Sequence, residues 1–438
     1  MAVVILLAVA TAGYVFLAPH GASESSTSQF STPTSSATTS STSSYSASST
    51  TSSNSESTTS ISSTFSAVTS DSSGPMPNAS SIEIANITVS QSHAFTAPEY
   101  IATDENTSTI YLTGANTNNV TLVNASTYAV VGRITLPADA NRIAIDQRTN
   151  MVYIGVAACE NGTPPIYNQC GGTRTATTDE IAVIDGYNDT IVRVFHIDLQ
   201  LFSVDSNSGV LWGGCGSCIG SSPEDNDGYL LGVDTKTGDV IANVSLGELA
   251  NSIAVDEKTN MIYVETCSVT AAGCGHLIAI NGSTDDEQFS VPLAYSELGN
   301  LVVDPAADTV FALGIIPGVE MLSIDGATGA IRYLSVLARC DIWSGSEKIL
   351  AFNPALGQVY VISNVFMVAV DAGSGQETYT LSIPGALFGA SSPDGGEVFL
   401  AMGPANLANV DTGYLLVIPG SANESYVTDF AQLSCHAP

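Results

Sequence analysis

The chain has 438 residues, of which 44% are apolar, so it is long enough to bury a large hydrophobic core. It carries 42 acidic and only 10 basic residues, which gives a net charge of −32. This charge argues against nucleic acid as a partner, and it predicts that an anionic membrane surface repels the main domain.

The first twenty residues form a hydrophobic segment. Residues 2–18 are an unbroken run of apolar and weakly polar residues, short for a membrane-spanning helix and long for the apolar core of a signal peptide. Small residues at 10–12 suit signal cleavage, but the run continues beyond them, which favours an uncleaved anchor. A helix that assembles into a filament is the third interpretation. Residues 1–20 are therefore predicted to be a membrane anchor, a signal or an assembly helix.

Residues 21–80 form a second segment that is rich in serine and threonine. From Ser23 to Gly74 these two residue types make up most of the sequence, and such a composition buries too little apolar surface to offset the entropy lost on ordering. The segment is typical of a disordered, O-glycosylated stalk, and a bare flexible linker is the alternative. Both interpretations hold the domain that follows away from a membrane.

Residues 81–438 contain a repeat. The phrase SIAVDEKTNMIYV at 252–264 matches RIAIDQRTNMVYI at 142–154, and further copies bring the number to seven. In each copy a polar residue ends an apolar run, and an aromatic residue follows seven positions later. The polar residues are Asp104, Asp146, Asp205, Asp256, Asp304, Asn353 and Ser392. The aromatic residues are Tyr111, Tyr153, Trp212, Tyr263, Phe311, Tyr360 and Phe399.

Each copy predicts four short strands. Turn-forming residues separate the polar residue from the aromatic one, and later apolar runs such as LLGVD and DVIANVSL supply a third and a fourth strand. Four antiparallel strands that recur every 40 to 60 residues or so are typical of a propeller blade. The sequence therefore predicts an all-β fold, a seven-bladed β-propeller of four-stranded antiparallel blades over residues 81–438.

Two phrases, NMVYIG…IAVID and NMIYVE…IAIN, resemble the YVTN-type β-propeller repeat of archaeal surface-layer and cell-surface proteins. The resemblance covers about residues 82–432. It implies a propeller at a cell surface. Because propellers carry many unrelated functions, it implies little about a ligand.

Two segments compete to close the ring. The strand-like sequence at 81–90 precedes the first repeat and has no blade of its own, so it is suited to complete the last blade and to hide that sheet's edge. The sequence at 424–433 is suited to the same outer position. Both interpretations stay open at this stage.

The eight cysteines predict disulfides, and hence an oxidising compartment outside the cytoplasm. Six of them form three neighbouring pairs, each within one loop between a second and a third strand. The simplest pairing is Cys159–Cys170, Cys215–Cys218, Cys267–Cys274 and Cys340–Cys435. For Cys215 and Cys218 a redox dithiol and half of a zinc site are the alternatives, but both lack the expected context.

Ten Asn-x-Ser/Thr sequons predict glycosylation of some asparagines, chiefly at exposed turns and strand ends. They are Asn78, Asn86, Asn106, Asn119, Asn124, Asn161, Asn188, Asn243, Asn281 and Asn423.

One face of the predicted ring is expected to bind a partner. The turn between the first and second strands never changes in length, whereas the long insertions at 155–180, 213–228, 265–276 and 402–413 all fall between second and third strands. Loops on a rigid scaffold are where binding sites usually lie. The candidate interaction residues on this face are Tyr167, Trp212, Glu224, Asp225 and Asp227.

No metal, cofactor or catalytic site is predicted. The acidic run at 224–228 lacks the glycine and glutamate spacing of an EF-hand, so a solvated acidic turn is the better interpretation. The seven polar repeat residues are expected to cap their own turns, and the seven aromatic residues to pack between blades. The five histidines are scattered, and no hydrolase, metalloprotease or phosphate-loop motif has a convincing context.

These observations predict an extracellular module at the cell surface, anchored in the membrane only through its N-terminal helix. The module is expected to bind a protein or glycan, or to build a surface structure, and to perform no catalysis. An extracellular propeller enzyme of lactonase or lyase type, with its site at the channel mouth, is the first alternative. A filament subunit that assembles through the N-terminal helix is the second.

Overall fold

The computed structural model describes the strands of the propeller and most of their turns. The described residues are 83–86, 98–114, 118–159, 177–197, 199, 201–214, 228–267, 274–296, 301–314, 320–337, 348–362, 366–382, 386–392, 396–402 and 414–419. They all belong to one compact unit, residues 73–438. The predicted helix at 1–20 and stalk at 21–80 lie outside the described residues.

The strands form seven separate four-stranded antiparallel sheets, as the repeat predicts. Blade 1 consists of β2 (Pro98–Asp104), β3 (Thr109–Gly114), β4 (Asn119–Asn124) and β5 (Val130–Thr135). Blade 2 consists of β6 (Asp139–Asp146), β7 (Met151–Cys159), β8 (Thr177–Asp185) and β9 (Thr190–Phe195). Blade 3 consists of β10 (Leu201–Asp205), β11 (Val210–Gly214), β12 (Tyr229–Asp234) and β13 (Val240–Ser245).

Three further blades follow the same order. Blade 4 consists of β14 (Leu249–Asp256), β15 (Met261–Cys267), β16 (Cys274–Asn281) and β17 (Glu287–Ser296). Blade 5 consists of β18 (Val302–Asp304), β19 (Thr309–Gly314), β20 (Glu320–Asp325) and β21 (Ile331–Val336). Blade 6 consists of β22 (Lys348–Asn353), β23 (Gln358–Ile362), β24 (Phe366–Asp371) and β25 (Glu377–Ser382).

The last blade combines both ends of the propeller sequence. It contains β26 (Ala386–Ser391), β27 (Glu397–Met402), β28 (Tyr414–Pro419) and, as its outermost strand, β1 (Glu83–Asn86). The β1 strand pairs antiparallel with β28, from Glu83 opposite Val417 to Asn86 opposite Tyr414. The strand within 81–90 therefore completes the last blade. Residues 424–433 lie outside the described residues.

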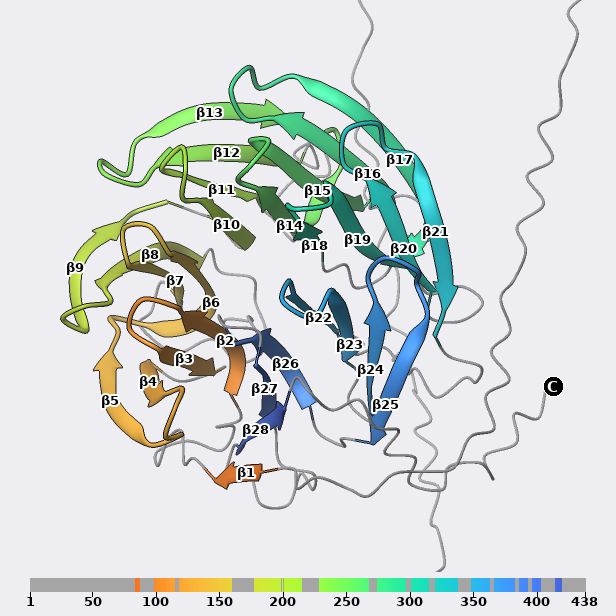
Figure 1. Cartoon of the computed structure of the whole chain (residues 1–438). Helices are drawn as coiled ribbons and strands as arrows, with labels where there is room; N and C mark the ends of the chain where they lie inside the picture. The colour runs from red at the N-terminus through yellow and green to blue at the C-terminus, as the bar shows by residue number, and fades with distance from the viewer. Residues whose placement is uncertain are drawn as a thin grey trace, which may run out of the picture. The chain divides into compact units, whose positions relative to one another are not determined.

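The blades are arranged in a ring, with the first strand of each blade towards its axis (Figure 1), and the region around this axis is termed the channel. The first strand of each blade is its innermost strand, and each innermost strand contacts those of the two neighbouring blades, with β26 next to β2 at the closure. The segments between second and third strands therefore begin at one end of the channel. The short turns between first and second strands lie at the other end.

The core lies between blades, because each sheet buries its faces against its neighbours. Seven clusters of buried apolar residues occur, and each draws on two adjacent blades. Every cluster contains one of the seven repeated aromatic residues, and none of these side chains is more than 1% exposed. Phe399 of the last blade packs with Ile101, Ile110 and Leu112 of the first. The expectation that these aromatic residues pack between blades is confirmed.

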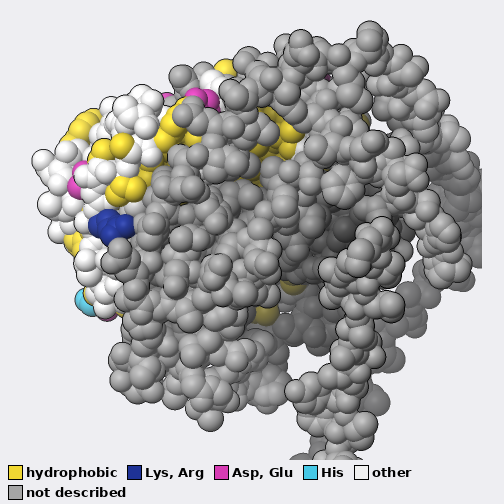
Figure 2. Space-filling view, turned by 90° about the horizontal axis from the view of Figure 1, so that it is seen from below, with side chains coloured by type: hydrophobic (Ala, Val, Ile, Leu, Met, Phe, Trp, Pro, Cys, Tyr) yellow, Lys and Arg dark blue, Asp and Glu magenta, His cyan; other side chains and the backbone are white. Residues whose placement is uncertain are grey.

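Several outermost strands expose apolar side chains. Examples are Val131 of β5, Ile241 of β13 and Val336 of β21, which are 60%, 57% and 61% exposed. Figure 2 shows hydrophobic side chains grouped among polar ones on the described part of one face, with few basic residues. These strands are sheet edges that have no further strand beside them in the sheet, a position that other chains can pair with.

Candidate binding site at the loop end of the channel

The two ends of the channel are defined by the two ends of the innermost strands. At the turn end, six of the innermost strands finish at their repeated polar residue, and β26 finishes one residue before Ser392. At the loop end, the strand begins beside the point where the second strand finishes: Leu201 lies opposite Gly214, and Leu249 lies opposite Cys267. The segments 215–227 and 268–273 follow directly after those two residues. The insertions that the sequence places on one face therefore start at the loop end.

The turn end is built in the same way from blade to blade. Asp146 Oδ1 accepts hydrogen bonds from the backbone N–H groups of Arg148 and Thr149, at 2.9 and 3.1 Å. Asp104, Asp205, Asp256 and Asp304 accept equivalent bonds in their own turns. The expectation that these residues cap their turns is confirmed.

Polar contacts also link neighbouring blades at the turn end. Gln147 Oε1 accepts a hydrogen bond from the Glu105 backbone N–H of the preceding blade at 2.9 Å. Glu257 Oε1 accepts the corresponding bond from Ser206 at 3.1 Å. The residue that follows the capping aspartate thus ties one turn to the next, and this end of the ring serves as a framework.

The repeated tyrosines stay neutral and add hydrogen bonds to this framework. Burial raises the pKa of Tyr153 to about 12. Burial, with the nearby Asp308 carboxylate as a smaller cause, also raises the pKa of Tyr263 well above its ordinary value. The Tyr263 hydroxyl donates a hydrogen bond to the Gly326 carbonyl of the next blade at 3.0 Å.

A cavity of about 180 Å³ lies at the loop end, between the innermost strands of blades 1 to 4. Its lining comes from β2, β6, β10 and β14 and includes one cation, Arg142. The lining residues are Tyr100, Ile101, Arg142, Ile143, Leu201, Phe202, Asn251, Ser252 and Ile253.

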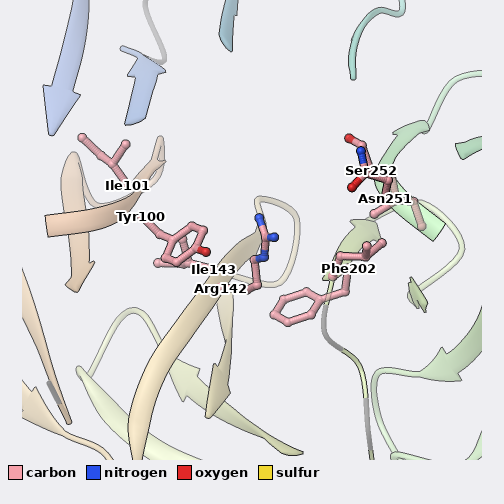
Figure 3. Close-up of a pocket in the computed structure, with 9 residues that line it drawn as sticks. Tyr100, Ile101, Arg142, Ile143, Phe202, Asn251 and Ser252 are labelled. Atoms are coloured by element: carbon pink, nitrogen blue, oxygen red, sulfur yellow. The ribbon is translucent and has the colours of Figure 1, made fainter. Parts of the chain in front are cut away.

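Arg142 is held by an aromatic neighbour. Its guanidinium carbon lies 4.9 Å from the centre of the Tyr100 ring, which is cation–π geometry. In Figure 3 the guanidinium projects between Tyr100 on one side and the Asn251 and Ser252 pair on the other, with Phe202 next to it. A cation that is stacked on a ring loses part of its freedom before a ligand arrives.

Asn251 places an amide at the same cavity. Its Nδ2 atom is buried and has no hydrogen-bond partner among the described residues. Burying such a donor without a partner costs free energy, so the group is suited to a ligand. The wall beside it is fixed, because Ser252 Oγ accepts a hydrogen bond from the Leu301 backbone N–H of the next blade at 3.0 Å.

Irregular pairing explains how these side chains reach the cavity. The ladder between first and second strands shifts register just before Tyr100, Arg142 and Ser252, in blades 1, 2 and 4. A bulge inserts one residue and bends the strand, which redirects the side chains next to it. Asn251 is the inserted residue in blade 4.

A second polar cluster lies at the loop end of blade 4. Glu248 Oε2 accepts a hydrogen bond from Thr266 Oγ1 at 2.7 Å and lies 3.2 Å from His276 Nδ1. The His276 side chain is 44% exposed, whereas Thr266 is fully buried. The carboxylate orients one ring nitrogen of the histidine, which leaves the other ring nitrogen as the candidate for acid–base chemistry.

The structure corrects the predicted interaction face at one residue. Trp212 is only 1% exposed and packs in the core between blades 3 and 4. Its ring lies against Gly232 of the third strand, where a Cβ atom would come within 3.0 Å of it. Trp212 is therefore a core residue, and its assignment to a binding surface is wrong. Tyr167, Glu224, Asp225 and Asp227 lie outside the described residues.

The cysteines are only partly described. Cys267 is disulfide-bonded, and its strand position lies opposite Cys274 in the ladder between β15 and β16. The pairing of these two cysteines stays a prediction. Cys159 ends β7. The remaining cysteines, Cys170, Cys215, Cys218, Cys340 and Cys435, lie outside the described residues.

Seven of the ten sequons fall in described segments. Asn106, Asn188 and Asn243 are exposed, as an acceptor of glycan must be. Asn119, Asn124 and Asn281 are half-buried at strand ends, and the last two accept backbone hydrogen bonds in their turns. Asn86 ends β1. Asn78, Asn161 and Asn423 lie outside the described residues, and glycosylation at every position stays a prediction.

No three histidine, cysteine or acidic side chains among the described residues come close enough to share a metal ion. The described part of the chain also contains no apolar helix of the length that a membrane crossing requires.

Sequence reasoning missed the residues that line the cavity. Tyr100, Arg142, Leu201 and Ser252 each stand four positions before the capping aspartate of their blade. A usable signal was present, since this position changes its residue type from blade to blade while the aspartate stays. An arginine at this position, in a chain with only 10 basic residues, was a second signal.

Comparisons with known proteins add support for the fold alone. No family model and no curated protein matches the chain. Many solved structures share its architecture. One of them is a hydrazine synthase from Kuenenia stuttgartiensis, with a TM-score of 0.58 and 13% sequence identity, over 74% of this chain and 96% of that one. At this identity the likeness concerns the propeller and not its activity.

Proposed function

We propose that this protein is an extracellular propeller that binds a protein or glycan at the cell surface, or builds a surface structure, and performs no catalysis. In this proposal a glycosylated stalk displays the propeller, and the N-terminal segment attaches it to the membrane. Membership of the YVTN-type surface proteins belongs to the same proposal, and the repeated phrases at 142–154 and 252–264 support it.

One observation carries the proposal. The described cavity lies at the loop end of the channel, where the long insertions also start, and its lining changes from blade to blade. A scaffold that repeats its framework and varies one end is arranged as a binding module. The disulfide-bonded Cys267, at the start of one insertion, is consistent with an oxidising compartment.

The location is tested by treating intact cells with a protease and identifying the released peptides by mass spectrometry. We expect peptides from 81–438 in the supernatant, and sugar masses on peptides from 21–80. Recovery of an unmodified chain only after the cells are broken would overturn the proposal. A cytosolic protein with a known location, followed in the same samples, controls for lysis.

A second function has one specific observation in its favour. The contact of Glu248 with His276 at 3.2 Å resembles the carboxylate–histidine pairs that supply acid–base catalysis. An extracellular enzyme of lactonase or lyase type is therefore the alternative. A panel of lactones and uronate polymers, assayed with the native chain and with His276→Gln, tests it: turnover that the substitution abolishes would replace the binding proposal with this one.

A further inference from the structure

We propose that the cavity at the loop end binds the carboxylate of an acidic sugar, taking one sugar ring at a time. This inference rests on the proposed function, since it names the ligand class of the same site. Three features carry it: a positioned cation, a buried amide without a partner, and the size and edges of the cavity.

The cation selects for a carboxylate. A guanidinium presents a planar fork of N–H donors that matches the two oxygens of a carboxylate. Arg142 lines the cavity and is stacked on Tyr100 at 4.9 Å. The chain as a whole carries a net charge of −32, so an anion is held only where a local cation outweighs the surrounding charge.

The amide supplies a second donor. Asn251 Nδ2 is buried at the cavity and has no hydrogen-bond partner within the described residues. A ligand oxygen at this position would satisfy it, so the site discriminates against ligands without one. Figure 3 shows Arg142 and Asn251 on different strands, and both residues line the cavity.

The size and the edges of the cavity favour a sugar. A volume of about 180 Å³ is slightly larger than the cavity of about 150 Å³ that holds a benzene ring. The lining strands β2, β6, β10 and β14 are all edge strands of their sheets, so their backbone N–H and C=O groups face the channel. These groups suit hydroxyls, and the Tyr100 and Phe202 rings offer flat apolar surfaces to the C–H face of a sugar.

The test compares ligands that differ by one group. Glucuronate and glucose are titrated into the full chain and followed by ligand-observed NMR and calorimetry. The buffer contains 150 mM salt, where the Debye length of about 8 Å screens the net charge of the chain. We expect glucuronate to bind with a dissociation constant of about 1 mM or tighter, and glucose to bind at least tenfold more weakly.

Four variants locate the site. Arg142→Gln is expected to weaken glucuronate binding at least tenfold, Arg142→Lys by less, and Asn251→Ala by about three- to tenfold. The matched control is Arg148→Gln, an exposed arginine at the turn end of the same blade, which should leave binding unchanged. The unfolding midpoint of each variant shows whether it is folded. If Arg142→Gln does not fold, Arg142→Lys takes its place in the comparison.

Three outcomes would overturn the inference: equal binding of glucose and glucuronate, unchanged binding in Arg142→Gln, or equal losses in Arg142→Gln and Arg148→Gln. If N-acetylleucine binds and glucuronate does not, the pocket takes a peptide-like carboxylate and the sugar assignment is wrong. A failure of this binding test does not change the result expected from the protease test on intact cells, so the two proposals can be rejected independently.

Discussion

Asp146 and Arg142 lie four residues apart on one strand, and the residue types at their two positions vary to different degrees from blade to blade. The position of Asp146 is filled by an aspartate in five blades, and these aspartates cap their turns in the same way. The position of Arg142 is filled by tyrosine, arginine, leucine and serine in the first four blades. Repetition marks the residues that every blade needs for its shape, and variation marks those that line the cavity, which we propose as the ligand site.

This difference has a consequence for the number of sites. A ring with identical residues at each loop end would offer seven equivalent positions. Here the varied residues of four neighbouring blades converge on one cavity with one cation. The ring is therefore regular as a scaffold, whereas the residues that line its loop end differ from blade to blade.

The largest effect on stability is expected from the repeated aromatic residues. Trp212→Ala removes a side chain that is 1% exposed from the core between blades 3 and 4, and should lower the free energy of unfolding by about 3–5 kcal/mol. Denaturant unfolding measures the change. Val131→Ala, at a side chain that is 60% exposed, should change it by less than about 0.5 kcal/mol. Similar losses in both variants would mean that the repeated aromatic residue has no special role.

The next largest effect concerns the turn caps. Asp146→Ala leaves two backbone N–H groups and the Thr149 hydroxyl without their acceptor, and should cost about 1–3 kcal/mol of unfolding free energy. Asp146→Asn keeps the Oδ1 acceptor and should cost less. Thermal unfolding of the two variants side by side distinguishes capping from a need for negative charge. Equal losses would favour the charge.

A smaller, pH-dependent effect is expected at Asp325. The Arg332 guanidinium, 2.8 Å away, and a bond from Thr328 lower the pKa of this carboxyl from 3.8 to about 2. A carboxyl whose pKa is lower in the folded state stabilises the fold above pH 4 or so, and this contribution is lost as the pH falls towards 2. The pair is partly exposed, so the effect should stay below about 1 kcal/mol.

The measurement is the difference in unfolding midpoint between the native chain and Arg332→Gln at pH 6 and at pH 2. We expect a lower midpoint for the variant at pH 6 and a smaller gap at pH 2. Arg148→Gln should show no such pH dependence. A gap that is constant with pH would assign the contribution of Arg332 to its bonds with backbone carbonyls of Ala307 and Asp308 instead.

The smallest effect on stability is expected at the loop end. Arg142→Gln removes a cation–π contact that is worth about 0.5–1 kcal/mol at a partly exposed site. Its unfolding midpoint should therefore stay close to that of the native chain while ligand binding falls. A loss as large as that of Asp146→Ala would make Arg142 a framework residue and remove the contrast between the two ends.

The fold was predictable because the framework repeats. Seven copies of a polar residue, aspartate in five of them, and an aromatic residue at a fixed spacing define the blade count, the first turn and the inter-blade core. The closing strand was ambiguous in the sequence, since two terminal segments have similar strand character and only the ladder with β28 distinguishes them. Trp212 was wrongly assigned to the interaction face because it stands next to an insertion, although its place in the repeat predicted a core position.

The site was not predictable in the same way. Its residues come from four strands up to 150 or so positions apart, and no short sequence motif joins them. Bulges decide that Asn251 enters the cavity, and no residue type marks a bulge in these strands. A comparison of each repeat position across the blades, instead of a search for motifs, would have found Arg142.

The closure of the ring by β1 sets a minimum time before the propeller can finish folding during synthesis. Asn86 pairs with Tyr414, so the first described strand of the propeller can pair only after the last one has been synthesised. At a synthesis rate of about 5–20 residues per second, the intervening 330 or so residues take on the order of 15–65 seconds. During that interval the edge of the unfinished ring and the waiting strand are both open to other chains. The last event of folding therefore joins the two ends of the propeller sequence, and until then the molecule has no closed channel.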